Sequence, residues 1–399
     1  MSNSEEASPG ARPTAIRSGW MLDGTGSVAI KDACVLFSGA HILDAGPAQK
    51  VAIPAEAHII DLPGHTVLPG LIDVHSHVSI DTLGRPAQQT TRPEGDIVLD
   101  AVAWLRTDLE AGVTTMRTLG DPAYLDIRMR QAQRDGRISA PRLHVAGNLI
   151  QSSHVEVAVS RSTCDGPDAI RAAIRASVRH GCDWVKFYST PDSRAEDPVL
   201  CIFSRAEVDL VFEEARRAQR PVSVHCHGGK AADWCIELGV DTLEHGFFLN
   251  RGQMREMATR GVTLVPTSGV VLLQRDNPSP AGVQQQVRGY LKMAHEEGVD
   301  CIPGTDAVHG RLDFEVERLV ASGWGIAEAI ACVTGKAAGL LGIDGQFGTL
   351  TRGKIADIAI VGGNLSADVS CLRQVEAVIQ GGEVVHDRLT GSRRQLGKG

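Results

Sequence analysis

Short apolar runs alternate with longer amphipathic stretches through the middle of the chain, between residues 71 and 341. Continuous apolar strands that alternate with helices predict a parallel sheet that is buried on both faces. The eight apolar runs are 71–78, 113–120, 142–150, 184–189, 221–228, 242–249, 263–270 and 301–307. Eight strand–helix units within about 270 residues suit the length of a (β/α)8 barrel. The pattern therefore predicts an α/β fold built as a TIM barrel.

The stretch between the fourth and fifth runs illustrates the helical pattern. Ser204 followed by Glu207 has the spacing of a capping box. The apolar residues that follow at helical spacing are Val208, Val211, Phe212 and Ala215. We expect similar helices at 167–180, 229–239, 250–260 and 325–341, with their C-caps at Gly181, Gly239, Gly261 and Gly342.

The two ends of the chain have a different pattern from the middle. Residues 14–66 and 347–390 both consist of short alternating segments separated by glycine turns. Each half is too small to bury a core alone, so we expect them to form one small β-sandwich domain, interrupted by a barrel at 67–346. The polar residues 1–13 are expected to be a disordered tail rather than a signal peptide, and 391–399 a C-terminal tail.

Unusual polar residues cluster at the C-terminal ends of the apolar runs. His75 and His77 share one strand face at the end of the first run, and imidazoles in such a position suit zinc. Four later runs, the fourth, fifth, sixth and eighth, carry Lys186, His225, His245 and Asp306. Taken singly, each has a structural explanation, such as a snorkelling lysine, a core histidine or a helix cap. A barrel draws its active site from this face, so six such residues together predict a shared metal site.

These residues carry a resemblance to a known family. Residues 68–77 (LPGLIDVHSH), 244–246 (EHG), 304–306 (GTD) and 348–357 (GTLTRGKIAD) are similar to signatures of the amidohydrolase superfamily. The resemblance is to its branch with two metals and a carboxylated lysine, and it extends from about residue 14 to residue 390. Residues 225–228 (HCHG), 240–245 (VDTLEH) and 264–267 (LVPT) further resemble dipeptidases of the Xaa-Pro and Xaa-Arg/Lys kind.

The resemblance implies a role for each candidate ligand. His75, His77 and Asp306 would hold the more buried metal, and His225 with His245 the more exposed one. Lys186, carboxylated by carbon dioxide, would bridge the two ions. Two divalent ions, with zinc favoured, would lower the pKa of a shared water to give a bridging hydroxide. Asp306 would take the proton and pass it to the leaving nitrogen.

Four further residues are candidates for substrate binding: His154, His227, Tyr188 and Arg117. Arg117 could pair with an acidic group of the substrate. His227 stands near the place where some proline-releasing relatives use a tyrosine for the substrate carboxylate. His309 is a weaker candidate on the loop after Asp306. Residues 116–120 (MRTLG) and 189–192 (STPD) also depart from the relatives' loops, so the substrate cannot be copied from them.

Several functions share this set of ligands. Deamination is disfavoured, because the relatives that deaminate carry Glu three positions after the fifth-strand histidine, whereas this chain has Gly228. Hydrolysis of a dipeptide or N-acyl amino acid is favoured. Hydrolysis of a cyclic amide, carbamate, urea or ester remains open. A catalytically inactive scaffold is opposed by the presence of all six ligand residues.

Composition narrows the class of partners. The net charge of −8, from 40 basic and 48 acidic residues, gives no surface for nucleic acid. The nine cysteines include no CxxC pair, which suits a reducing cytosol. No stretch approaches the length of a membrane span. We therefore expect a cytoplasmic homo-oligomeric enzyme that acts on a small-molecule substrate.

Overall fold

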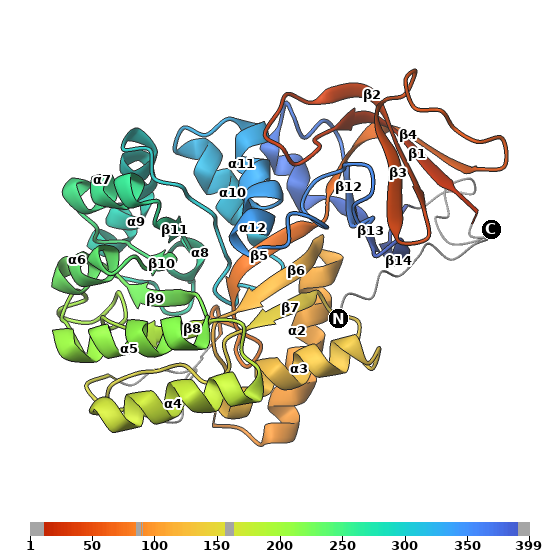
Figure 1. Cartoon of the computed structure of the whole chain (residues 1–399). Helices are drawn as coiled ribbons and strands as arrows, with labels where there is room; N and C mark the ends of the chain where they lie inside the picture. Colours follow the sequence, from red (N-terminus) through yellow and green to blue (C-terminus); the bar gives the residue numbers. More distant parts are fainter. Residues whose placement is uncertain (1–11, 85–88, 90, 156–162, 390–399) are drawn as a thin grey trace. The chain divides into compact units, whose positions relative to one another are not determined.

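The computed structural model describes residues 12–84, 89, 91–155 and 163–389, and these fall into two compact units (Figure 1). The first unit comprises residues 1–72, 108–114 and 324–399, and the second comprises 73–107 and 115–323. The expected tails at 1–13 and 391–399 lie almost wholly outside the described residues. The domain limits at residues 66 and 347 stay a prediction, because compact units need not coincide with folding domains.

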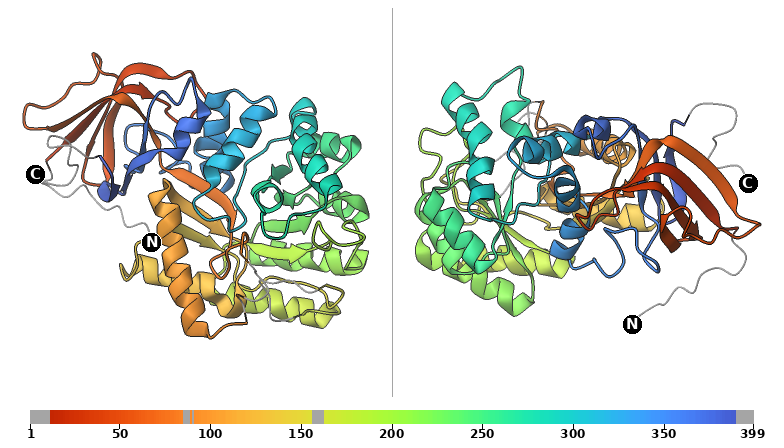
Figure 2. Two further views of the ribbon diagram at one scale, coloured as in Figure 1. Left: turned by 180° about the vertical axis from the view of Figure 1, so that it is seen from behind. Right: turned by 90° about the horizontal axis from the view of Figure 1, so that it is seen from above.

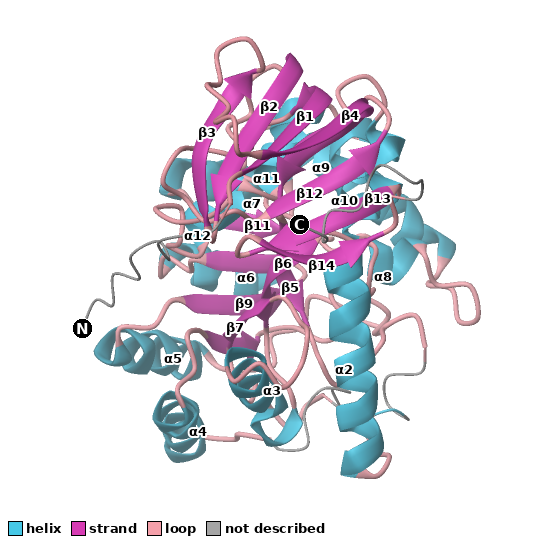
Figure 3. Cartoon of the chain, turned by 90° about the vertical axis from the view of Figure 1, so that its right-hand side faces the viewer, coloured by secondary structure: helices cyan, strands magenta, loops and turns pink. Residues whose placement is uncertain are grey.

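The first unit contains one seven-stranded sheet in the order β14-β13-β12-β4-β1-β2-β3 (Figure 3). Its strands are β1 (Thr14–Met21), β2 (Ile30–Ser38), β3 (His41–Pro47), β4 (His58–Pro69), β12 (Ile358–Gly362), β13 (Val375–Gln380) and β14 (Glu383–Asp387). Strand β4 joins the two ends of the chain, because it pairs in parallel with β1 and antiparallel with β12. Strands from both ends also share one apolar core, which includes Ile16, Ile60, Ile358 and Ile379.

Parallel strands dominate the second unit. Its strands form a three-stranded sheet in the order β5-β6-β7 and a four-stranded sheet in the order β11-β10-β9-β8. They are β5 (Leu71–Ser76), β6 (Val113–Thr118), β7 (Arg142–Val145), β8 (Val185–Tyr188), β9 (Val222–Cys226), β10 (Thr242–His245) and β11 (Thr263–Val265), of which β5 and β6 begin in the first unit. A parallel bridge between Ile150 and Phe187 connects the two sheets. Seven of the eight apolar runs therefore contain a strand.

The eighth run pairs with its neighbours without forming a regular strand. Ile302 N–H donates to the Leu264 carbonyl, and Gly304 N–H donates to the Pro266 carbonyl. On the other side, Asp306 N–H donates to the His75 carbonyl over 2.7 Å. Pro303 has no N–H to donate, so the run lacks one ladder hydrogen bond at this position. The run still brings Asp306 beside the end of β5.

Helices lie on the outer side of the strands β8 to β11 (Figure 1), as the views from behind and from above also show (Figure 2). The helices of the second unit are α2 (Glu94–Glu110), whose end passes into the first unit, η1 (Pro122–Tyr124), α3 (Leu125–Arg134), α4 (Pro167–His180), α5 (Arg205–Ala218), α6 (Gly229–Glu237), α7 (Arg251–Arg260), α8 (Gly269–Leu272), α9 (Ala281–Glu296) and α10 (Leu312–Ala321). Strands that alternate with helices confirm the α/β class expected from the hydrophobic pattern. The capping box at Ser204 and Glu207 is also present.

The helix expected at 325–341 is two helices in the structure, α11 (Ile326–Cys332) and α12 (Gly335–Leu340), followed by the short helix η2 (Val369–Arg373). Thr334 interrupts it with non-helical dihedral angles, φ −139° and ψ −97°. Close packing explains the break, because a Cβ at Gly335 would lie 2.4 Å from the Gly24 carbonyl oxygen. The prediction of a single helix was therefore wrong, because a long-range contact overrides the apolar periodicity.

No helix among the described residues is both long and apolar enough to cross a membrane. All nine cysteines lie in the described part of the chain, and none forms a disulfide.

Candidate metal centre

The six candidate ligands come together in the second unit. They lie at the ends of neighbouring strands or just after them: His75 in β5, His77 after it, Lys186 in β8, His225 in β9, His245 in β10 and Asp306 near the end of the eighth run. The histidines and the lysine are each at most 5% exposed. Asp306 is the most open of the six, with 17% of its side chain exposed. The strand ends thus place four imidazoles, an amine and a carboxylate in one buried cluster.

Short distances join the carboxylate of Asp306 to three of the imidazoles. Asp306 Oδ1 lies 3.4 Å from His75 Nε2 and 3.2 Å from His77 Nε2, and Asp306 Oδ2 lies 3.9 Å from His245 Nδ1. Ligand atoms of His75, His245 and Asp306 all fall within 4.8 Å of one another. The ring of His225 lies 4.5 Å from that of His245, between centroids. One divalent cation can be reached by several of these atoms.

The backbone at the cluster is strained where the ligands turn inward. His245, Asp306 and Ala307 have positive φ angles of 70°, 52° and 61°. Residues other than glycine reach this region at a cost of order 1–3 kcal/mol, and such strain gathers at functional sites. A tight approach adds to it, because a Cβ at Gly304 would lie 2.4 Å from the backbone nitrogen of His75. The local fold therefore places these side chains in the cluster even though their backbone dihedral angles are unfavourable.

Three of the imidazoles are oriented by a bond to Nδ1. His75 Nδ1–H donates to Glu244 over 2.7 Å, and His77 Nδ1–H donates to the Gly120 carbonyl over 2.6 Å. His245 Nδ1 is hydrogen-bonded to the Thr267 hydroxyl over 2.7 Å. Each bond leaves Nε2 as the nitrogen that can bind a cation. Metal-binding histidines are commonly held in this way.

Two buried nitrogen atoms of the cluster have no hydrogen-bond partner among the described residues. They are Lys186 Nζ and His225 Nδ1, whereas His225 Nε2 lies 3.2 Å from the Pro191 carbonyl. A buried polar atom without a partner is costly, because it has lost its water. A cation at His225 and a carbamate on Lys186 would satisfy both atoms. The donor set therefore fits a metal centre.

Burial also sets the protonation of these groups. It lowers the pKa of the Lys186 amine to about 8, against the opposing charges of Glu244 and Asp306. Burial holds the pKa of both His225 and His245 well below its usual value, so both rings are neutral at pH 7. Burial alone would raise the pKa of Asp306, but His75, His77 and His245 together hold it well below its usual value, so the carboxylate is ionised. Neutral imidazoles and a carboxylate are the forms that bind a metal.

The four predicted substrate contacts fall in different places. Tyr188 stacks on the ring of His225 with centroids 4.0 Å apart, and His227 meets the same ring edge-on at 4.7 Å. His227 is buried against Phe247, and its Nδ1 has no partner among the described residues. His154 is exposed, and its Nδ1 lies 2.8 Å from the Ser152 hydroxyl. Tyr188 and His227 are thus beside the ligands.

Arg117 was expected to contact the substrate, but the structure places it elsewhere. Its side chain is fully buried, and Nη2 donates to Glu244 over 3.1 Å. The guanidinium lies 4.3 Å from the centre of the Trp184 ring. A buried guanidinium that is already paired with a carboxylate cannot also receive an acidic substrate group. His309 is similarly committed, since it stacks on Trp104 and its Nε2 donates to the Ile80 carbonyl.

Sequence reasoning gave no role to two buried carboxylates that support the cluster. Glu244 accepts the bond from His75, and Asp73 accepts bonds from the backbone N–H groups of His75 and Thr305. Asp73 also accepts from the Thr305 hydroxyl over 2.6 Å. Glu244 directly precedes the ligand His245, and Asp73 lies two residues before His75. No signal in the sequence pointed to their distant partners, His75 for Glu244 and Thr305 for Asp73.

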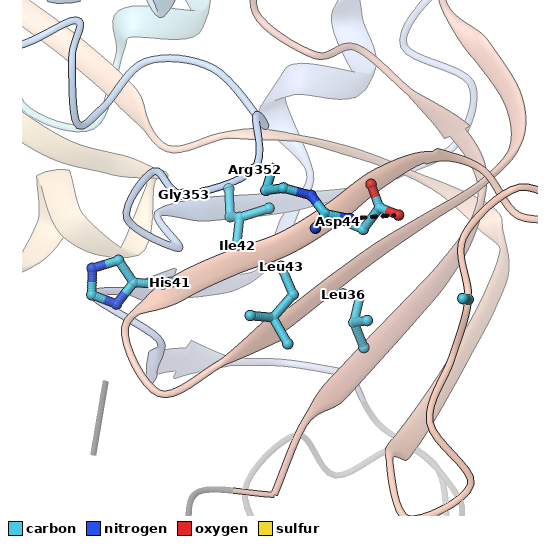
Figure 4. A pocket seen from close by; sticks show the side chains of 8 residues that line it. Leu36, His41, Ile42, Leu43, Asp44, Arg352 and Gly353 are labelled. Atoms are coloured by element: carbon cyan, nitrogen blue, oxygen red, sulfur yellow. Dashed lines mark ion pairs between the residues drawn. The ribbon is translucent and has the colours of Figure 1, made fainter. Parts of the chain in front are cut away.

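The first unit has a hollow of its own, of about 420 Å³, lined by Leu36, His41, Ile42, Leu43, Asp44, Ala52, Arg352 and Gly353 (Figure 4). Its one charged contact joins Arg352 to Asp44 over 3.5 Å, and Arg352 is 74% exposed. None of the predicted ligands lines it. The chemistry expected from the sequence therefore belongs to the second unit.

Comparisons with known proteins agree with the geometry. An imidazolonepropionase of Rhizorhabdus wittichii is 26% identical over 386 residues, covering 85% of this chain and 90% of the relative. An ochratoxinase of Aspergillus niger is 25% identical over 426 residues, covering 92% and 85%. The crystal structure of a Xaa-Pro dipeptidase with methionine in its active site is 29% identical, with a TM-score of 0.83 over 94% of this chain and 100% of that one.

The amidohydrolase family matches residues 66–385, which is most of the chain and includes every candidate ligand. The chain therefore belongs to the amidohydrolase family and is a metal-dependent hydrolase of carbon–nitrogen bonds.

Proposed function

We propose that this enzyme hydrolyses the amide bond of a dipeptide or an N-acyl amino acid at a centre of two divalent ions. One observation carries the proposal: an unpartnered buried lysine nitrogen lies among four imidazoles and a carboxylate that converge from separate strands. A single structural ion would need neither the lysine nor so many ligands, because structural zinc is satisfied by four.

The proposed ligands divide between two ions. His75, His77 and Asp306 would hold the first, and His225 through its unpartnered Nδ1 and His245 would hold the second. Lys186, as its carbamate, would supply the anionic group shared by the two ions. Nitrogen and oxygen donors of this kind favour zinc, although manganese or cobalt also suits them. When bound, two such ions lower the pKa of a shared water and polarise a carbonyl group.

Asp306 is the residue that we propose as the general base and acid. Its carboxylate is ionised and is the most exposed of the ligand set, so it can reach both a water and the substrate. It accepts the proton of the attacking water and then delivers it to the leaving nitrogen. His227 and Tyr188 lie beside His225 and are the proposed substrate contacts, with exposed His154 farther out.

Relatives support the choice of bond. The solved Xaa-Pro dipeptidase and the ochratoxinase both align along almost the whole chain. The imidazolonepropionase relative favours a second candidate, the opening of a cyclic amide at the same centre. A carbamate or urea substrate belongs to the same alternative, and an inactive scaffold is the least favoured.

A substrate panel separates these candidates. The zinc-reconstituted protein would be given dipeptides, N-acyl amino acids and cyclic amides, with the products analysed by mass spectrometry. Release of a free amino acid supports the first proposal, and ring opening supports the second. Less than about one bound ion per chain in metal-replete protein would instead favour a scaffold.

We further propose that the strands of the second unit close into a (β/α)8 barrel and that those of the first unit form a β-sandwich. The bond from Asp306 N–H to the His75 carbonyl supports closure, since it links the last run to the first strand. We also propose a cytoplasmic homo-oligomer whose ligand is a small molecule rather than nucleic acid or a membrane. Light scattering of the purified protein would test the oligomeric state.

A further inference from the structure

Glu244 lies directly behind the proposed metal centre and is saturated with hydrogen bonds. It is fully buried in β10, one residue before His245. Its Oε2 accepts from His75 Nδ1 over 2.7 Å. Its Oε1 accepts from the Ser223 hydroxyl over 2.7 Å, from the Thr242 hydroxyl over 2.5 Å and from Arg117 Nη2 over 3.1 Å. Four donors from four separate strands thus hold one carboxylate.

Arg117 completes this arrangement from β6. Its Nε donates to the Val74 carbonyl in β5, and its Nη1 donates to the Thr242 hydroxyl over 3.1 Å. The Trp184 ring covers its guanidinium at 4.3 Å. Such a charge is costly to bury unless it is paired and hydrogen-bonded, and removing one partner of a buried pair is strongly destabilising. The Arg117–Glu244 pair is therefore costly to bury, and it lies directly behind the proposed ligand His75.

We propose that Glu244 and Arg117 are positioning residues for the metal centre. Glu244 fixes the ring of His75 with its proton on Nδ1, so that Nε2 faces Asp306, 3.4 Å away. Arg117 fixes Glu244 and ties it to the backbone next to His75. Neither residue is among the six proposed ligands. The inference rests on the proposed function, since it needs His75 to be a ligand.

The binding affinity for zinc is the measurement that tests the pair. A carboxylate that orients a ligating histidine typically contributes 10–100-fold in metal affinity or activity. We expect Glu244→Gln to weaken zinc binding at one of the two sites by about this factor, measured by competition with a chromophoric chelator. The cobalt-substituted variant should also show a changed visible absorption spectrum, because the ligand His75 is no longer held in one orientation.

Glu214 provides a matched control outside the centre. It is 4% exposed in α5 and is held by Arg175 and Arg171, so it is also a buried glutamate paired with arginine. Glu214→Gln should lower the thermal midpoint without changing zinc affinity. An equal loss of affinity in both variants would overturn the positioning role, since it would follow from general destabilisation.

Arg117→Lys keeps the inference testable if Glu244→Gln does not fold. It preserves the charge but loses the three-way hydrogen bonding of the guanidinium to Val74, Thr242 and Glu244, so zinc affinity should fall below that of the unmodified protein. Unchanged affinity in every folded variant, with two ions bound by the unmodified protein, overturns the inference alone. Failure of the unmodified protein to bind zinc would instead overturn the proposed function.

Discussion

Individual residues reveal the site through the polar atoms that the fold leaves without partners. Among the described residues, Lys186 Nζ, His225 Nδ1 and His227 Nδ1 are buried and unpartnered in the same region. A second such group comprises Ser268 Oγ, Tyr290 OH and Glu315 Oε2. The first group contains two proposed ligands and their neighbour His227, whereas the second contains the buried carboxyl group of Glu315. We therefore test the first group with Lys186→Ala and the second with Glu315→Gln.

Lys186→Ala should lose metal and activity together. The variant removes the only amine of the cluster, so the proposed carbamate bridge cannot form. We expect metal content to fall below that of the unmodified protein. The rate of hydrolysis should fall by at least about 10²-fold, because electrostatic stabilisation of the transition state is lost. Short carboxylic acids should restore part of both, because they replace the missing carbamate. Full activity in the variant, measured with elemental analysis, would refute the bridging role.

Glu315→Gln should change how stability depends on pH. Burial raises the pKa of Glu315 from 4.5 to about 7. The folded state therefore keeps a proton that the unfolded state releases between these values, and the unfolding free energy falls as pH rises through this window. A glutamine has no proton to lose, so we expect the variant to gain on the order of 3 kcal/mol relative to the unmodified protein between pH 4.5 and pH 8.

Urea denaturation at the two pH values measures this difference. Glu213→Gln is the control, because Glu213 is 63% exposed. That variant should follow the unmodified protein at both values. A gain for Glu315→Gln that is the same at pH 4.5 and pH 8 would show that the carboxyl group does not titrate in this window.

Secondary-structure elements supply the geometry that single residues cannot. The eighth apolar run carries Asp306 to β5 only because Gly304 permits close approach to His75. By contrast, the helices depend on local signals, as the capping box of α5 shows. Contacts between elements and signals within one element can therefore be tested by different variants.

Gly304→Ala should damage the centre, although it adds only a methyl group. The new Cβ would meet His75 backbone atoms within 2.4–2.8 Å, and the backbone has to shift. Such overpacking costs about 1–3 kcal/mol. We expect a lower thermal midpoint and weaker zinc binding, measured by calorimetry and chelator competition. Gly289→Ala in α9 is the control, since its Cβ meets nothing within 4 Å and should stabilise the helix. Equal behaviour of the two variants would contradict the steric argument.

At the scale of the whole molecule, the proposed metal ligands and the large sheet lie in different units. All six proposed ligands belong to the second unit, whereas the seven-stranded sheet belongs to the first. A ligand that binds only the folded state stabilises that state by mass action. Metal removal should therefore act on one unit more than on the other.

Chelation should lower the unfolding temperature and should reduce the protection of the second unit against hydrogen–deuterium exchange. Bound metal at 1,000 times its dissociation constant contributes about 4 kcal/mol. We expect hydrogen–deuterium exchange to rise in peptides from β5, β9 and β10 after chelation and to stay unchanged in β1 to β3. Re-addition of zinc should reverse the effect. Uniform loss of protection in both units would contradict a metal centre confined to the second.

The sequence by itself determined the features that depend on local pattern. Apolar runs and amphipathic stretches predicted the strands and helices of the second unit, and the alternating ends predicted that both ends of the chain contribute strands to one small β-domain. His75 in β5 and His77 just after its end, two positions apart, identified one side of the centre. These features were predictable because strand and helix periods act on neighbouring residues.

Only the tertiary structure decided the features that depend on distant partners. Arg117, expected at the substrate, is fully buried and donates to Glu244, 127 positions away. The helix expected at 325–341 is interrupted where Gly335 approaches Gly24. Neither partner leaves a periodic trace in the sequence, because each contact forms only once the intervening chain has folded. The ligand types could thus be inferred from the sequence, while the groups that hold them in place could not.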